Sequence, residues 1–340
     1  MASIKDVARQ ASVSISTVSH VMNGTRFVEA GTAERVHQAI HDLSYIPSSV
    51  ARSLKSQNTH TLGMLVPNCS NPYFSEIMRS VEDRCFELGY NLILCNTYDR
   101  PERQTKYLKI LTEKRVDGLI LITASSPDQW KLPLKLNIPV VLVDREVRNN
   151  FCDLVETAHE YGAQLATQHL LDLQHRHIAC IAGPLELSPS TQRIQGWQTA
   201  LQQAGCTPSL LLHSDFTSQG GYDSMLKLLD YRHSTTTEKP TAVIICNDLM
   251  AIGALRAVHE KGLSVPTDLS IVGFDDIELA HFTSPPLTTV RQPKQEMGTQ
   301  AVNLLLERIT GVRTTTRTLL LKPELAIRDT SAPCLTKEER

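Results

Sequence analysis

The sequence predicts a small all-α N-terminal domain followed by two doubly wound α/β subdomains. Its 340 residues are more than one ordinary hydrophobic core accommodates. Residues 1–46 show only helical spacing of apolar side chains, whereas the chain from residue 61 onward alternates short apolar runs with helical stretches. This alternation is typical of parallel sheets with helices on both faces, and the hydrophobic fraction of 41% is sufficient to fill their cores.

Two short helices joined by a tight turn are expected at the N-terminus. The first has an apolar stripe at helical spacing that consists of Ile4, Val7, Ala8 and Ala11. Residues 12–14 interrupt the pattern with serines, which cap helices and favour turns. The second stripe is expected to point inward and consists of Ile15, Val18, Val21 and Met22. A third helical stretch, residues 32–43, can close the bundle.

The outward face of the second helix carries Ser16, Thr17 and His20. Their hydroxyl and imidazole groups can form hydrogen bonds with base edges in the major groove of DNA. The pattern therefore favours a helix-turn-helix, with a plain three-helix bundle as the alternative. Arg26 follows in a loop, where it either reaches a phosphate or base edge or is simply solvated.

Charge and cysteine content fit a cytoplasmic DNA-binding protein. The first sixty residues carry a net charge of +2, from six basic and four acidic side chains, whereas the whole chain carries -2. This distribution suits a small DNA-reading module on a near-neutral body, with an affinity that falls as salt rises. The N-terminus shows no signal-peptide pattern, and no apolar run is long enough to span a membrane. The eight cysteines have no Cys-x-x-Cys spacing, so we expect them to be reduced.

The remainder of the chain alternates between expected strands and helices. The strand-like runs are residues 61–67, 90–95, 118–122, 140–143, 177–182, 210–212, 242–246, 269–274 and 319–321. The helical stretches are residues 74–88, 102–114, a helix before Asn137, and residues 161–173, 191–204, 220–229, 250–261 and 295–309.

Polar and aromatic residues gather where the expected strands end. Ligands of open α/β sheets bind beyond the carboxyl ends of the strands, so these side chains are candidates for one binding site. Carboxylates and amides can bond the hydroxyl groups of a sugar, and aromatic rings can stack on its apolar face. Plainer interpretations exist as well, because Asp144 could cap the following turn, Asn247 could cap a helix, and Tyr73 and Phe74 could belong to the core. The candidate ligand-binding residues are Asn71, Tyr73, Phe74, Asp144, Arg145, Asn247, Phe274, Asp275 and Gln292.

Several motifs resemble the lac-repressor family of bacterial transcription regulators. In the N-terminal segment they are Lys5-Asp6-Val7-Ala8 and the ungapped run from Val13 to Asn23. The resemblance implies a DNA-binding headpiece over residues 1–46 and a hinge helix within residues 47–60. In this family two hinge helices pair in the minor groove, where a leucine wedges between base pairs and kinks the duplex. Ala51, Leu54 and Lys55 match that motif, with Leu54 as the wedge, although a leucine in a polar linker is otherwise more often a packing residue.

The rest of the chain is similar to the periplasmic-binding-protein-like sensor of the same family, particularly of its ribose-sensing members. The similar runs include residues 116–119, 275–280 and 285–289, together with the candidate ligand-binding residues. The resemblance implies a sensor over residues 61–340 with two subdomains, in which the chain crosses back. The first subdomain is expected at residues 61–160 and 291–322, and the second at residues 161–290 and 323–340.

The resemblance further implies a homodimeric repressor of a carbohydrate-use operon in the bacterial cytoplasm, associated with the nucleoid. Its partners would be pseudo-palindromic double-stranded operator DNA and a small sugar, D-ribose first, that controls DNA affinity. Another sugar or a purine corepressor is the alternative effector. Two positions depart from the family pattern. Thr191 stands where many sugar-sensing members have arginine, so either Arg145 or Arg193 compensates, the affinity is weaker, or the effector is another sugar. Ser12 stands where glycine is usual, at a cost of about 1 kcal/mol if the position needs a positive φ.

An enzyme is the competing class of protein. No phosphate-binding glycine motif, His-Glu-x-x-His pattern or metal-spaced cysteine and histidine cluster occurs in the sequence. A sugar-processing enzyme and a free sugar receptor are therefore the weaker alternatives, and no catalytic residue, metal or cofactor is expected.

Overall fold

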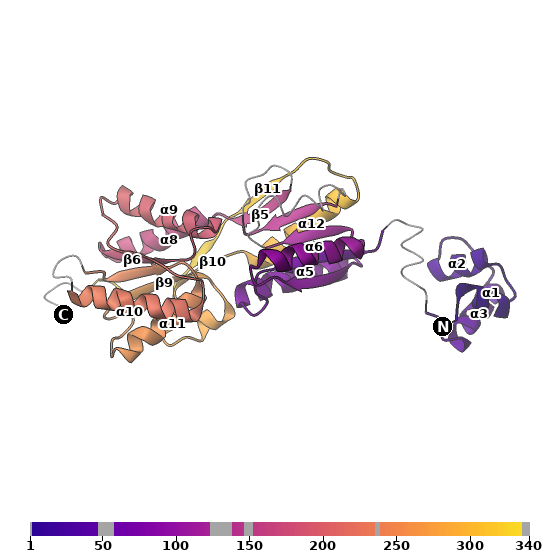
Figure 1. Ribbon diagram of the computed structural model, residues 1–340, viewed down its shortest axis with the longest axis horizontal. Helices are drawn as coiled ribbons and strands as arrows, with labels where there is room; N and C mark the ends of the chain where they lie inside the picture. Colours follow the sequence, from indigo (N-terminus) through magenta and orange to yellow (C-terminus); the bar gives the residue numbers. More distant parts are fainter. Residues whose placement is uncertain (1, 47–57, 123–137, 146–151, 235–238, 335–340) are drawn as a thin grey trace. The chain divides into compact units, whose positions relative to one another are not determined.

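The computed structural model describes residues 2–46, 58–122, 138–145, 152–234 and 239–334. The chain forms two compact units, Met1–Thr59 and His60–Arg340 (Figure 1). We call them the headpiece unit and the sensor unit. The helix expected before Asn137 lies outside the described residues.

The described part of the headpiece unit forms a bundle of three helices, α1 (Ile4–Gln10), α2 (Ile15–Asn23) and α3 (Ala30–Asp42). The backbone N–H of Ser3 donates to Asp6 Oδ2 at 3.0 Å, which caps the start of α1. Gly24 ends α2 at a φ of 62°, a conformation that glycine adopts without steric cost. The bundle closes over a small core that consists of Val7, Ala8, Ala11, Val18, Val36 and Ala39.

The structure corrects one expected core position. Ile15 was predicted to point inward, but it is 44% exposed. It is the first residue of α2, so its side chain lies at the end of the helix and not over the core that Val18 fills.

The described residues of the sensor unit form two sheets of six strands each. The first sheet has the order β11-β5-β4-β3-β1-β2, with all neighbouring strands parallel. Its strands are β1 (Thr61–Val66), β2 (Asn91–Asn96), β3 (Gly118–Leu121), β4 (Val140–Val143), β5 (Asp153–Thr157) and β11 (Thr318–Leu321). Its helices are α5 (Pro72–Glu87), α6 (Pro101–Glu113) and α12 (Lys294–Ile309).

The second sheet has the order β12-β10-β9-β8-β6-β7, in which only β12 is antiparallel to its neighbour. Its strands are β6 (Ile178–Ala182), β7 (Leu211–His213), β8 (Ala242–Ile245), β9 (Ser270–Asp275), β10 (Thr289–Arg291) and β12 (Glu324–Ala326). Its helices are α8 (His159–Asp172), α9 (Ser188–Gln203), α10 (Ser218–Ser234) and α11 (Asp248–Glu260), with a 3-10 turn η2 (Glu278–His281). Helices α8 and α9 cover one face of this sheet and α10 and α11 the other (Figure 1).

The chain crosses between the two halves three times. It passes from β5 to α8, from β10 to α12, and from β11 to β12. The predicted fold class, an all-α headpiece with a two-part α/β sensor, is confirmed. Among the described helices, none is long and apolar enough to cross a membrane.

Strand β5 was missed because both of its ends are polar. Asp153 and Thr157 are nevertheless buried, and the Asp153 carboxylate forms a two-pronged ion pair with Arg313, at 2.7 and 3.0 Å. This pairing lets an acidic residue occupy a buried strand, which an apolar-run criterion cannot anticipate. The three-residue strands β10 and β12 were also missed, because each includes a charged residue and neither forms an apolar run such as the one at residues 210–212.

Candidate functional site

The outer face of α2 presents polar groups that its own turn holds in place. Ser14 caps the helix by accepting a hydrogen bond from the backbone N–H of Thr17 at 3.1 Å. Ser16 is exposed, whereas Thr17 and His20 are partly exposed. The Nδ1 atom of His20 lies 2.9 Å from the hydroxyl of Thr25, so Thr25 fixes the direction of the imidazole. Sequence reasoning missed Thr25, because its role depends on the loop that follows α2.

Of the remaining candidate DNA contacts, only Arg26 belongs to the part of the chain that the structure describes. Arg26 is exposed, in the loop after α2. Ala51, Leu54 and Lys55 lie outside the described residues. Ser12, in the turn before α2, has a φ of 54°, which confirms that this position needs a positive φ.

A cavity of about 380 Å³ lies in the sensor unit, between residues of its two halves. The first half contributes Asn71, Tyr73, Phe74, Asp144 and Arg145 to the wall, and the second contributes Asn247 and Asp275. Asn71 caps α5 and Asn247 caps α11, each through its side-chain oxygen. The capping roles and the cavity-lining positions are therefore compatible.

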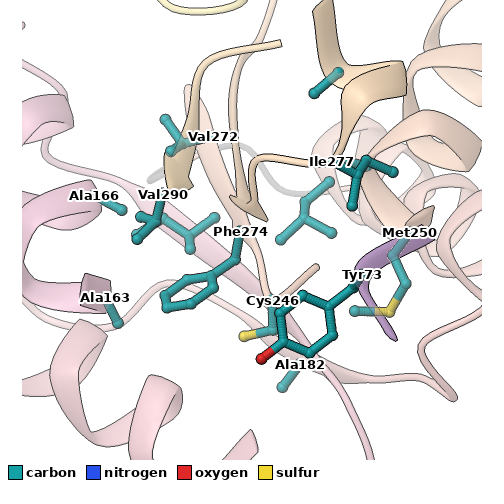
Figure 2. Close-up of a cluster of buried hydrophobic side chains, with 14 of the residues drawn as sticks. Tyr73, Ala163, Ala166, Ala182, Cys246, Met250, Val272, Phe274, Ile277 and Val290 are labelled. Carbon is teal, nitrogen blue, oxygen red and sulfur yellow. The ribbon is translucent and has the colours of Figure 1, made fainter. Parts of the chain in front are cut away.

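Two candidate residues, Phe274 and Gln292, lie behind the cavity wall. Phe274 is fully buried and packs with core residues such as Val290 (Figure 2). The guanidinium of Arg193 lies over its ring, 3.8 Å from the centroid. Gln292 Nε2 donates to Asp275 Oδ1 at 2.7 Å. Both residues support lining groups and neither belongs to the lining.

The cavity wall also contains residues that were not among the candidate ligand-binding residues. Phe216 faces Gly183, where even a β-carbon would lie 2.2 Å from the Phe216 ring, so only glycine permits this approach. Strand-end reasoning missed most of these side chains, because they lie on loops and helix starts beyond the predicted runs. The additional lining residues are Pro67, Asn68, Tyr98, Asp99, Pro184, Leu187, Pro189, Arg193, Asp215, Phe216, Thr217, Ser218 and Leu249.

Arg193, and not Thr191, brings a guanidinium from α9 to the cavity. Thr191 is exposed, and its hydroxyl donates to the Ser188 carbonyl at 3.0 Å. Arg193 is buried, donates to the carbonyl of Cys246 and lies 3.8 Å from Asp275 Oδ1. The departure at Thr191 therefore leaves the cavity with two arginines, Arg145 and Arg193.

Each arginine of the wall has a carboxylate partner. Arg145 Nη1 donates to Asp99 Oδ1 at 2.7 Å, and Arg193 faces Asp275. Asp144 accepts a hydrogen bond from the Tyr73 hydroxyl at 2.6 Å. Both arginines among the described lining residues are thus paired with a carboxylate, so the wall suits a neutral ligand rich in hydrogen-bonding groups.

Burial and neighbouring charges move the pKa values of three wall residues. Burial raises the pKa of Asp275 to about 7, although Arg193, Lys294 and Gln292 oppose the change. Burial would also raise the pKa of Asp144, but His159, Arg193 and the Tyr73 hydroxyl outweigh it and lower that pKa to about 2. Burial, followed by the charge of Asp144, raises the pKa of Tyr73 well above its usual value, so its hydroxyl stays a donor.

Strained backbone marks both carboxylate positions. Asp144 has a φ of 69° and Asp275 a φ of 126°, both on the side that favours glycine. Such conformations cost about 1–3 kcal/mol each and persist where the surroundings hold them, most often at ligand sites. Asp144 and Asp275 thus combine burial, perturbed pKa and strain in one cavity wall.

Two sequence families match this chain. Residues 3–48 match the bacterial regulatory proteins of the lacI family, and residues 167–331 match a periplasmic binding protein-like domain. The ribose operon repressor of Escherichia coli (strain K12) is 43% identical over 96% of this chain and 98% of its own length. The HTH-type transcriptional repressor PurR of Histophilus somni (strain 129Pt) has the same identity and coverage.

Solved structures agree with the sequence comparisons. The lac repressor dimer bound to operator and an anti-inducer has a TM-score of 0.88 and 30% identity, over 97% of this chain and 99% of that one. A lacI-family regulator from Enterococcus faecium with bound ribose has a TM-score of 0.74 and 34% identity, over 81% of this chain and 100% of that one. The relatives are transcriptional repressors and not enzymes. The chain belongs to the lacI family of bacterial regulatory proteins and is a DNA-binding repressor of that family.

Proposed function

We propose that this repressor controls a carbohydrate-use operon and that D-ribose, bound in the sensor cavity, changes its affinity for operator DNA. The observation that carries the proposal is the cavity wall, in which carboxylates and amides from both halves of the sensor meet aromatic rings. Paired carboxylate and amide acceptors suit the hydroxyl groups of a pentose, and Phe74, Tyr73 and Phe216 suit its apolar face. A ligand that bonds both halves at once would favour their closure.

A purine is the competing effector, because PurR proteins are as similar to this chain as the ribose operon repressor is. The charges of the wall favour the sugar. Asp99, Asp144, Asp215 and Asp275 provide acceptors in excess of the donors from Arg145 and Arg193. A pentose presents a hydroxyl donor on nearly every carbon, whereas a purine base presents few donors for so many carboxylates.

For DNA reading, we propose that Ser16, Thr17 and His20 contact base edges in the major groove, with Arg26 at a phosphate or base edge. The support is their exposure on the outer face of α2 and the match of residues 3–48 to the lacI family. Ala51, Leu54 and Lys55 would act in the minor groove, with Leu54 as the wedge that bends the operator.

We propose a homodimer that works in the bacterial cytoplasm on a pseudo-palindromic operator. The lac repressor relative binds its operator as a dimer. In this chain, exposed apolar side chains occur in both halves of the sensor, with Phe86 and Leu94 in the first and Leu279 and Phe282 in the second. In the proposed dimer, a second copy of the chain would bury some of these side chains. The two halves of the sensor would be the moving subdomains, with the three chain crossings as their hinge.

The effector can be tested by calorimetry of the full-length protein. D-ribose should bind with micromolar affinity, whereas D-glucose and hypoxanthine should show no heat of binding at the same concentrations. Binding of hypoxanthine without binding of ribose would show that the effector is a purine and not a sugar. The operator can be selected from a random DNA pool, which supplies the probe for the experiments below.

A further inference from the structure

Six buried side chains form a closed polar network beside the cavity. The hydroxyl of Tyr73 donates to Asp144 Oδ1 at 2.6 Å, and Gln292 Oε1 lies 3.1 Å from the same hydroxyl. Gln292 Nε2 donates to Asp275 Oδ1 at 2.7 Å, and Arg193 lies 3.8 Å from that oxygen. His159 closes the network. Its members are Tyr73, Asp144, His159, Arg193, Asp275 and Gln292, and each is at most 4% exposed.

His159 joins the two halves of the sensor within this network. Its Nδ1 atom faces the Arg193 guanidinium, 3.2 Å from Nη2 and 3.4 Å from Nε. On the other side, His159 Nε2 lies 3.3 Å from Asp144 Oδ1. His159 begins α8, the first element after the chain crosses from β5 into the second half. The imidazole therefore stands between a cavity carboxylate of the first half and a cavity guanidinium of the second.

The protonation of His159 follows from these neighbours. Burial, followed by the charge of Arg193, lowers the pKa of His159, so the imidazole is neutral at physiological pH. Arg193 can only donate, so Nδ1 must accept and the proton resides on Nε2, directed at Asp144. The Nε2 proton has no well-aligned acceptor among the described residues, although Asp144 Oδ1 is within reach. The contact between the halves is thus close but incomplete.

We propose that His159 is a positioning residue for the effector, whose Nε2–H completes a hydrogen bond to Asp144 when ligand draws the two halves together. The proposal rests on the proposed function of the cavity. Asp144 and Asp275 each use Oδ1 within the network, while no hydrogen bond between described residues uses Oδ2 of either carboxylate. Those two oxygens, one from each half, remain for the ligand. The distance between these two Oδ2 atoms depends on how closely the halves approach each other, and the contact of His159 with Asp144 fixes that approach. Ligand binding and closure of the halves are linked in this way.

Three substitutions separate the two contacts of the imidazole. His159→Gln extends an amide nitrogen toward Asp144, in place of Nε2. His159→Asn keeps an acceptor for Arg193 in place of Nδ1 but is too short to reach Asp144. His159→Leu removes both. Loss of a hydrogen bond to a charged group should weaken ribose binding about tenfold or more in the Asn and Leu variants, whereas the Gln variant should stay within about threefold of the wild type.

Calorimetry with D-ribose on the full-length variants gives these affinities, and thermal unfolding reports whether each variant folds. His169→Gln is the matched control, because His169 lies on the same helix and contacts Ser331 instead of the cavity. Wild-type affinity in the Asn variant, or affinity in the Gln variant as weak as that of the Leu variant, would overturn the proposal. A wild-type protein that binds no ribose refutes the proposed effector instead.

A second measurement needs no effector. Histidine ring nitrogen and carbon NMR spectra, with His159 assigned by the Gln variant, should show a neutral imidazole protonated at Nε2 between pH 6 and 8. Asp144→Asn should shift the His159 signals, while the signals of His169 should remain in place. A proton on Nδ1, or His159 signals that ignore Asp144→Asn, would contradict the proposed contact whatever the effector is.

Discussion

The headpiece unit and the sensor unit distribute their functional residues along the chain in opposite ways. The proposed base-reading residues Ser16, Thr17 and His20 lie within the nine residues of α2. The six residues of the buried polar network come from α5, the position after β4, α8, α9, β9 and the segment after β10, between positions 73 and 292. A local site can be recognised from one short motif, whereas a site assembled from many elements depends on the whole fold.

The two units also differ in how they support their sites. The described part of the headpiece has a core of six buried apolar side chains, so its stability is limited by a small core. The sensor has a large hydrophobic core that includes residues of both sheets and a smaller core in its first half, and these can hold strained and desolvated groups such as Asp275. We therefore expect substitutions in the sensor cavity to change the effector response without changing DNA reading, and the reverse for the headpiece and hinge.

Asp275→Ala should produce the largest effect on effector binding. The substitution removes a ligand acceptor and leaves Arg193 buried without its carboxylate, and truncating one partner of such a pair costs about 2–5 kcal/mol. Ribose affinity measured by calorimetry should fall beyond detection, while operator affinity without effector should equal that of the wild type. Retained induction by ribose would remove Asp275 from the effector site.

Leu54→Ala tests the reverse case, in which DNA binding is weakened and effector binding is retained. Loss of the wedge should weaken operator binding by about 2 kcal/mol, because the kinked duplex loses the apolar group that holds its base step open. Fluorescence anisotropy with the selected operator measures this loss, and ribose affinity should be unchanged. Equal operator affinity in the variant and the wild type would remove Leu54 from the DNA interface.

His20→Ala and Thr25→Val form a graded pair within the headpiece. Removing a base-reading imidazole should cost about 1–3 kcal/mol of discrimination at one base pair of each half-site. Thr25→Val keeps the imidazole but removes the hydroxyl that orients it, so a smaller loss at the same base pair is expected. The measurement is anisotropy with single-base operator variants. A loss that is uniform across all positions would indicate a phosphate contact or a folding defect.

The smallest expected effect is a pH dependence of the affinity of the sensor for ribose. The pKa of Asp275 is about 7 in the folded protein, above its ordinary value, so protonated Asp275 contributes stability that is present below about pH 4 and is lost as pH rises through 7. A sugar hydroxyl donates to the ionised carboxylate, so ribose binding should release protons near pH 7. Affinity should then rise about two- to fivefold from pH 6 to 8.

Calorimetry in buffers of different ionisation enthalpy measures that proton release, and Asp275→Asn is the control that cannot release it. A proton release in the Asn variant equal to that of the wild type would assign the titration to another group.

Much of the fold could be predicted from the sequence because the buried strands are continuous apolar runs, as in β3, β4 and β8. Strand β5 could not be predicted in this way, since it begins with the buried Asp153, which an ion pair with Arg313 stabilises in place of an apolar residue. At the cavity, the strand-end rule led to Asp144, Asn247 and Asp275, which line the wall. His159 and Phe216 could not be found in that way, because their neighbours come from distant segments and only the folded chain brings them together.

The central claim, that the sensor cavity controls DNA affinity, is tested most directly by one titration. Operator affinity of the wild-type protein is measured by anisotropy with and without saturating D-ribose. The account predicts a change of about 5- to 150-fold, the range of ordinary coupling free energies, and no change in the Asp275→Ala variant. Equal operator affinity with and without ribose, in a protein that calorimetry shows to bind the sugar, would contradict it.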